Sequence, residues 1–326
     1  MSENKMYLSY SSIVKLCRNP KQFYKEYILE ERETLENRYL KQGGLFHLFI
    51  LEPENFDDKF VVLPDKLPSD SVQQVIRNVW ESYRLNNEDD PSGLTLDDFE
   101  EGILNHLKAI NLYQSYKTDK QRFDKVASPE GRLYFNTMVD AEANGKVIVD
   151  MKLVNDSKLK SSIMLENETV KQLMFTDTPK IDVRHEIELK ADIPNYSFGL
   201  KGIIDLLRID HKEETIHIVD FKTTSKSLDD WRANFEESPY MYWLQTMIYK
   251  ELVYSLVPQD SKRDWKLKVW FPVIDNNDQV YVFPVSTETL HSSQQRAMGV
   301  YDICDWHITK KIYDLPYSYE KNLVEL

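Results

Sequence analysis

Apolar and polar residues alternate over 183–189, which places two glutamates on one side of a strand and apolar residues on the other. Apolar runs follow over 198–209 and 215–221, and short polar turns separate the three segments. Such connections favour sequential antiparallel strands, and continuous apolar runs favour strands that are buried on both faces. Two further strands are predicted over 265–274 and 280–285. The pattern therefore predicts a central sheet in the second half of the chain.

Apolar residues at helical spacing predict helices before and after this sheet segment. The first helix is expected to be capped by Ser11 or Ser12 and to end before Pro20. A helix over 43–53 is expected to be entered through its two glycines. Further helices are predicted over 20–28, 69–85, 95–113, from 128 onward, 240–256 and 286–311.

Composition narrows the class of protein. The chain has 326 residues, of which 41% are hydrophobic and 29% charged, as in ordinary globular proteins. No apolar run reaches the ~18 residues that cross a bilayer, and no secretory signal is visible, so a cytoplasmic location and no membrane partner are expected. Cys17 and Cys304 are too few for a disulfide framework or a zinc finger. The missing G-x-x-x-x-G-K-[ST] motif argues against a bound nucleotide.

Two acids lie where acids are costly. Asp205 stands in the apolar stretch GIIDLL, and Asp220 follows the apolar stretch IHIV. A buried carboxylate must be hydrogen-bonded, paired or bound to a metal. Lys222 shares the side of a strand with Asp220, because side chains repeat every two residues. Two carboxylates and a lysine suggest a site for Mg²⁺, which prefers oxygen ligands. The alternative is a salt bridge between Asp220 and Lys222 near a strand end.

The wider set of motifs resembles the PD-(D/E)XK nuclease superfamily, in its branch of RecB-like and phage exonuclease VIII-type (lambda-exonuclease-like) recombination exonucleases. That branch has a glutamate-bearing strand, then G-x-x-D, D-x-K and Q-x-x-x-Y, with a histidine upstream. The matching residues are His47, Glu186, Gly202, Asp205, Asp220, Lys222, Gln245 and Tyr249.

The resemblance implies the roles of these residues. The expected catalytic residues are Glu186, Asp205, Asp220, Lys222, Gln245 and Tyr249. The expected metal ligands are His47, Asp205 and Asp220, with Glu186 bound directly or through water. Glu188 is a rival to Glu186, and His47 could instead be a core residue of an apolar helix. The expected metal is Mg²⁺, for which Mn²⁺ can substitute, and an iron–sulfur cluster is excluded because it needs four cysteines.

The resemblance also implies a fold. It is an α/β PD-(D/E)XK (restriction-endonuclease-like) core with a central mixed sheet flanked by helices and with helical insertions. We expect one nuclease domain over 1–326. Residues 57–180 would form a mainly helical insertion within it, and 183–285 would hold the catalytic sheet and the Q-x-x-x-Y helix.

The function that the resemblance implies is a metal-dependent deoxyribonuclease. It would be a 5′→3′ exonuclease on double-stranded DNA ends that makes 3′ single-stranded tails for phage-type recombination. A single-strand annealing protein and further copies of the chain are expected partners, in the host cytoplasm if a phage encodes the chain. One alternative is a structure-specific or single-strand nuclease in repair or replication. The other is a catalytically inactive DNA- or partner-binding module on the same scaffold.

The net charge of −13 argues against a general basic surface that coats DNA, so a local basic groove is expected. The candidate DNA-binding residues are Lys15, Arg18, Lys201 and Lys226. Other candidate phosphate contacts are Lys21, Lys25, Arg296, Lys310 and Lys311. For the N-terminal group, the alternative is an ordinary solvated helix face.

Overall fold

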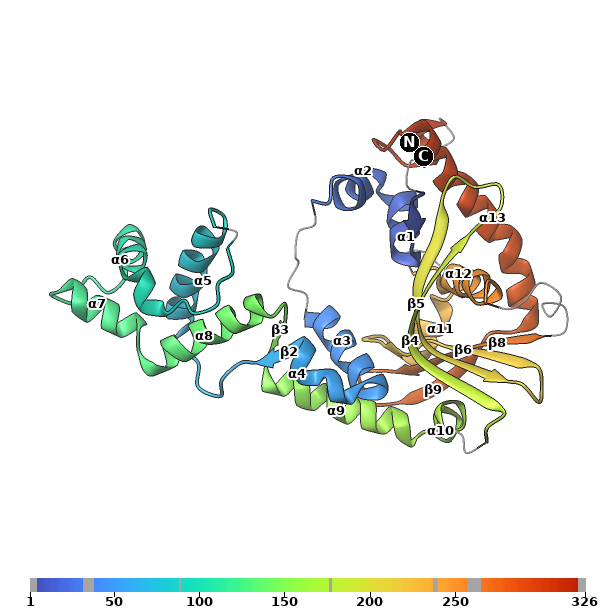
Figure 1. The fold of residues 1–326 in the computed structure, drawn as a ribbon, viewed down its shortest axis with the longest axis horizontal. Coiled ribbons are helices and arrows are strands. Elements are labelled where there is room, and N and C mark those ends of the chain that lie inside the picture. Colours follow the sequence, from blue (N-terminus) through green and yellow to red (C-terminus); the bar gives the residue numbers. More distant parts are fainter. Residues whose placement is uncertain are drawn as a thin grey trace. The chain divides into compact units, whose positions relative to one another are not determined.

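A computed structural model describes residues 5–31, 38–87, 89–175, 178–236, 240–256 and 265–321. The chain forms two compact units (Figure 1). The first combines Met1–Asn37 with Lys160–Leu326, and the second comprises Arg38–Leu159. The assignment of 57–180 as an insertion within a single nuclease domain stays a prediction.

The first unit is built on a mixed sheet, as the sequence predicts. Its strands in the described ranges are β1 (Tyr7–Leu8), β4 (Ile181–Asp192), β5 (Gly199–Asp210), β6 (Thr215–Val219), β7 (Lys222–Thr223), β8 (Lys266–Ile274) and β9 (Val280–Pro284). Strand β5 lies inside the sheet: it pairs antiparallel with β4 and β6 and parallel with β1. Strand β8 pairs parallel with β6 and β7 and antiparallel with β9. The central position of β5 explains its apolar composition, because neighbours cover both of its edges and both of its faces are packed over 204–207. Ile203 is 50% exposed, so the predicted burial on both faces does not extend along the whole strand.

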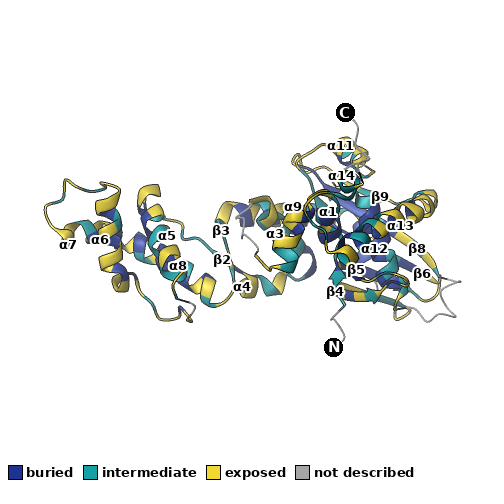
Figure 2. Cartoon of the chain, turned by 90° about the horizontal axis from the view of Figure 1, so that it is seen from above, coloured by how far each residue is buried: buried dark blue, intermediate teal, exposed yellow. Residues whose placement is uncertain are grey.

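Helices cover this sheet and complete one apolar core. They are α1 (Tyr10–Arg18), α2 (Pro20–Phe23), the π-helix η1 (Tyr24–Ile28), α11 (Leu228–Ala233), α12 (Tyr242–Tyr254) and α13 (Thr287–Lys310). The short helices α10 (Glu168–Met174) and α14 (Tyr317–Glu320) also belong to this unit. Helix α12 packs on β4 and β5, and α13 packs on α12 and α1 (Figure 1). Figure 2 shows buried residues concentrated on α12 and the strands beside it. This packing brings α12 next to the strands that carry the candidate acids.

The second unit is mainly helical. Its elements are α3 (Arg38–Leu51), η2 (Pro53–Asn55), α4 (Phe56–Lys59), β2 (Phe60–Val62), α5 (Asp70–Arg84), η3 (Leu96–Phe99), α6 (Glu100–Ala109), α7 (Asp119–Val126), α8 (Pro129–Ala143), β3 (Val147–Val149) and α9 (Met151–Glu166), whose last turns belong to the first unit. Strands β2 and β3 form a short parallel pair. One apolar cluster lies among α5, η3, α6, α7 and α8, and a second joins α3 to α9.

Several predicted boundaries are confirmed. Helices α5, α8 and α13 follow Ser69, Ser128 and Ser286 as expected. The hydroxyl groups of Ser128 and Ser286 accept backbone N–H bonds, which satisfies donors at the helix starts. Among the described residues, no helix is both long and apolar enough to cross a membrane.

Other boundaries were predicted wrongly. The cap of α1 is Ser9 rather than Ser11 or Ser12, because Ser9 and Ser12 satisfy each other's backbone N–H groups in a capping box. Helix α3 starts at Arg38, so its two glycines lie inside it and not at its entry. Helix α6 ends at Ala109, and Asn111 has a left-handed backbone just beyond it.

The start of β5 provides a test of this fold. A Cβ atom at Gly199 would lie 2.5 Å from the Tyr7 ring and 2.8 Å from the Ala191 carbonyl oxygen. We expect Gly199→Ala to lower the free energy of unfolding by about 1–3 kcal/mol, because one of these neighbours must move. Gly299→Ala is the control, because a Cβ at this position on α13 would meet no described atom within 4 Å. This substitution should raise the free energy of unfolding by up to about 1 kcal/mol, since alanine favours a helix more than glycine does. Urea unfolding of both variants measures this, and equal stability would contradict the packing at β1, β4 and β5.

Candidate active site

Three acids lie in a row across neighbouring strands of the first unit. His185 and Ile187 on β4 oppose Leu206 and Ile204 on β5, so Glu186 between them lies opposite Asp205. Leu206 in turn opposes Val219, the last residue of β6, so the next residue, Asp220, follows on the other side of Asp205. Since adjacent strands are about 4.8 Å apart, this register alone brings the three acids together.

The backbone distinguishes Glu186 from Glu188. Glu186 has φ of 47°, a left-handed conformation that costs about 1–3 kcal/mol for a residue other than glycine. A carboxylate oxygen of Glu186 lies within 4.8 Å of one of Asp205. Glu188 is exposed and pairs with Lys190 at 3.5 Å. The geometry therefore favours Glu186 as the acid that acts with Asp205.

Asp205 is 7% exposed and holds the chain after β6 in place. The backbone N–H of Phe221 donates to Asp205 Oδ2 at 2.7 Å. This bond replaces a ladder bond between backbones, so the strand predicted over 215–221 ends at Val219 and resumes as β7. The interruption leaves Asp220 at the strand break, beside Asp205.

Asp220 is 1% exposed, and both of its oxygens have partners. Gln245 Nε2 donates to Oδ1 at 2.9 Å, and the Tyr249 hydroxyl lies 3.0 Å from the same oxygen. The Tyr249 hydroxyl can alternatively donate its hydrogen bond to the Ile203 carbonyl oxygen at 2.9 Å. Lys222 Nζ pairs with Oδ2 at 2.5 Å. The D-x-K and Q-x-x-x-Y motifs therefore meet on one buried carboxylate.

Helix α12 supplies Gln245 and Tyr249 from one face, because residues four apart lie above one another on a helix. The helix can approach β5 because position 202 has no side chain. A Cβ at Gly202 would lie 3.1 Å from Leu252 and 3.4 Å from the Tyr249 ring. The glycine of the G-x-x-D motif thus makes room for the tyrosine of the Q-x-x-x-Y motif.

The charges at the site follow from burial and from the neighbouring acids. Burial lowers the pKa of Lys222, but the carboxylates of Asp220 and Asp205 outweigh this effect, so its pKa is raised and the ammonium stays charged. Burial, together with the charges of the same two acids, raises the pKa of Tyr249 well above its usual value. Tyr249 is therefore a neutral hydrogen-bond donor, and Lys222 is the cation.

Sequence reasoning missed the aromatic side chains beside Lys222. The Lys222 ammonium lies 5.5 Å from the centre of the Tyr242 ring, which stacks on Tyr240 at 5.7 Å. The Tyr10 hydroxyl donates to the Tyr240 carbonyl oxygen. The spacing of Tyr242, three residues before Gln245 on the same helix, is the signal that could have placed it at the site.

The donor set fits a divalent cation. Glu186, Asp205 and Asp220 provide carboxylate oxygens, which are the ligands that Mg²⁺ and Mn²⁺ prefer. His47 lies on α3 in the second unit and is half-buried beside Phe46. Its role as a metal ligand stays a prediction.

The candidate DNA-binding residues are spread over several elements of the first unit. Lys15 pairs with Glu26 on η1, and Arg18 is exposed at the end of α1. Lys201 opposes Lys190 across β4 and β5. Lys226 bonds to Asn234 at 3.3 Å and lies over the Tyr240 ring. Lys226 is therefore near the aromatic residues of the site, and the DNA contacts of all four stay predictions.

A comparison of the sequence with known protein families gives the same assignment as the motifs and the sheet. The pattern of the PD-(D/E)XK nuclease superfamily matches residues 7–299, so the chain belongs to that superfamily. Nucleases of this superfamily use divalent metal ions, and their substrate is DNA. The comparison with curated proteins finds no match.

Two solved structures are similar to the chain at low identity. One is a protein from Eubacterium rectale named as a candidate exonuclease, with 11% identity, a TM-score of 0.43, and coverage of 99% of this chain and 84% of that chain. The other is the protein SSO0001, with 11% identity, a TM-score of 0.24, and coverage of 71% and 87%.

The choice between the two glutamates gives a prediction. Glu186→Gln should weaken Mn²⁺ binding at least about tenfold, because it removes a carboxylate next to Asp205. Glu188→Gln is the matched control two residues away and should bind Mn²⁺ as the wild type does. Calorimetric titration of the full chain measures both affinities. A larger loss in Glu188→Gln would reverse the assignment.

Proposed function

We propose that the chain is a metal-dependent deoxyribonuclease that degrades double-stranded DNA from its ends, in the 5′→3′ direction. The observation that supports a working nuclease is the row of Glu186, Asp205 and Asp220 with Lys222 beside it. The direction of cleavage rests on the resemblance of the motifs to phage recombination exonucleases. So do the 3′ tails, the annealing-protein partner, the assembly of several copies and the setting in a host cytoplasm.

We assign different roles in phosphodiester hydrolysis to the residues of the site. Asp205 and Asp220 would hold a Mg²⁺ ion, with Glu186 as a further carboxylate and His47 as a proposed ligand. When bound, the ion lowers the pKa of water and neutralises charge on the phosphate. Gln245 and Tyr249 orient Asp220 through its Oδ1 atom. Their role is to keep the carboxylate in one position, so we place them as positioning residues.

Lys222 has different tasks in the empty and the loaded site. Without a cation it neutralises Asp220, whose burial would otherwise be unfavourable. In the loaded site its ammonium is available for negative charge that develops on the phosphate in the transition state. An inactive binding module would have no reason to keep Asp205, Asp220 and Lys222 all together, which is why we favour an enzyme.

The end requirement is tested with linear and closed circular duplex DNA. We expect Mg²⁺-dependent release of nucleotides from a 5′-labelled linear duplex, no cleavage of closed circles, and no activity with EDTA. Ca²⁺ should bind without supporting turnover, because its looser coordination positions water less well. Asp220→Asn is the control for contaminating nucleases. Nicking of closed circles would contradict the exonuclease proposal and favour a structure-specific nuclease.

The two tasks of Lys222 are tested with Lys222→Met, which keeps the aliphatic stem. Without metal, we expect a loss of unfolding free energy on the order of 3 kcal/mol, because a buried carboxylate loses its counter-ion. Mn²⁺ should bind the variant more tightly than the wild type, since a competing positive charge is gone. Cleavage should nevertheless fall about 10²–10³-fold.

The matched control is Lys190→Met, which removes an exposed partner of Glu188 and should cost about 0–1 kcal/mol. Urea unfolding, Mn²⁺ titration and single-turnover cleavage measure the three effects. Cleavage by Lys222→Met at the wild-type rate would refute the catalytic role.

A further inference from the structure

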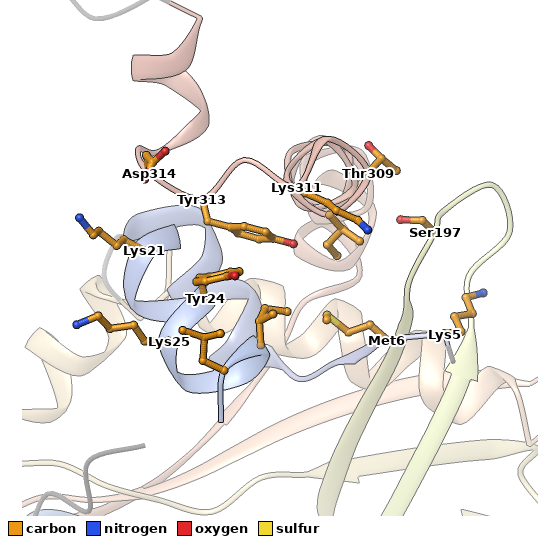
Figure 3. A pocket seen from close by; sticks show the side chains of 13 residues that line it. Lys5, Met6, Lys21, Tyr24, Lys25, Ser197, Thr309, Lys311, Tyr313 and Asp314 are labelled. Atoms are coloured by element: carbon orange, nitrogen blue, oxygen red, sulfur yellow. The ribbon is translucent and has the colours of Figure 1, made fainter. Parts of the chain in front are cut away.

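The first unit contains an open pocket of about 1110 Å³ away from the acids. It lies between the helices α2 and η1 on one side and the end of α13 on the other, with the β4–β5 turn beside it (Figure 3). The residues of its lining that matter here are Lys5, Lys21, Tyr24, Lys25, Lys311 and Tyr313.

The charge of this pocket is opposite to that of the chain. Four lysines and a single aspartate line it, in a protein whose net charge is −13. Lys5 pairs with Asp192 at 3.0 Å. Lys21 and Lys25 are exposed and make no ion pair with the part of the chain that the structure describes. Such a concentration of lysines selects an anionic ligand.

Aromatic rings lie between the lysines. Tyr24 and Tyr313 are 5.2 Å apart between ring centres, and Tyr24 is 37% exposed. In Figure 3, Lys21 and Lys25 lie on one side of this pair of rings, and Lys5 and Lys311 lie on the other. Partly exposed aromatic rings flanked by cations are the arrangement that binds single-stranded nucleic acid, with bases on the rings and phosphates on the cations.

We propose that this pocket binds a single-stranded segment of the DNA substrate, which deepens and rests on the proposed nuclease function. The pocket adjoins the start of β5, where Tyr7 pairs with Gly199. Asp205 is six residues further along this strand, or about 20 Å at 3.4 Å per residue. A DNA strand that rises about 3.4 Å per nucleotide, as in a duplex, would span this distance in roughly six nucleotides, and a more extended single strand would span it in fewer.

A DNA strand fits the pocket better than a free nucleotide does. Its volume exceeds the upper limit of roughly 1,000 Å³ that is typical of small-molecule sites. Lysines on both sides of the rings suit a chain of phosphates, whereas a mononucleotide carries its charge at one end. An acidic peptide could also meet the lysines, and the experiment below separates it from DNA.

The test measures binding of a fluorescent 15-nucleotide oligothymidine to the full chain in EDTA, where no cleavage occurs. Lys21→Glu/Lys25→Glu should weaken binding about tenfold or more and reduce the salt slope by about 1.4, the value for two lost contacts on a single strand. Tyr24→Ala, which removes one stacking ring, should weaken binding by roughly 5- to 100-fold. Lys212→Glu/Lys266→Glu is the charge-matched control on exposed lysines at the other end of β5, and it should bind as the wild type does.

Several outcomes of this binding test would overturn the proposal. An equal loss in the control pair would mean a general charge effect. Tighter binding of blunt duplex than of oligothymidine would exclude a single-strand site, and equally strong competition by polyglutamate or by thymidine monophosphate would point to a peptide or a nucleotide. Because the assay contains no cleavage, a chain that binds but does not cut would refute only the proposed function. A chain that cuts with binding unaffected by these variants would refute only this inference.

Discussion

The burial of the Asp220 carboxylate is the constraint on which the site of the first unit depends. A carboxylate that is 1% exposed at the end of an apolar strand is stable only where hydrogen bonds and a countercharge replace water. Gln245 and Tyr249 provide the bonds and Lys222 the countercharge. Two of these partners come from α12, so the helix must lie close to β5, and the glycine at position 202 keeps a Cβ from crowding Leu252 and Tyr249 there. The contacts that pack α12 on the sheet are therefore the same contacts that stabilise the Asp220 carboxylate.

This constraint explains which features could be predicted from the sequence. An acid inside an apolar run can be recognised from that segment of the sequence alone, because the apolar pattern of one strand predicts both its burial and which residues share a face. Asp205, Asp220 and the sheet therefore follow from the pattern, and the mixed sheet is confirmed. The spacing of Gln245 and Tyr249 is equally local, since four residues make about one turn of a helix.

The remaining features depend on partners that are distant in the sequence. The interruption of the strand after Val219 is caused by an aspartate side chain on β5 that accepts the N–H of Phe221. The left-handed backbone of Glu186 occurs inside a strand that reads as regular alternation. Neither feature has a local signature in the sequence, and the first depends on a side chain that lies on a different strand. Both lie at the candidate site, where local rules are expected to give way to function.

The distribution of charge determines how an acidic chain can meet DNA. Salt screens exposed charges beyond about 8 Å at physiological ionic strength, so acids elsewhere on the surface oppose a phosphate only weakly. The binding of a phosphate therefore depends on the protein charges that lie within about 8 Å of it. At the row of Glu186, Asp205 and Asp220, one lysine faces three carboxylates, so a phosphate is repelled there until a cation binds. At the pocket around Tyr24 the local charge is already positive. DNA binding should therefore depend on the metal at the acids but not at the pocket, which separates holding the substrate from cutting it.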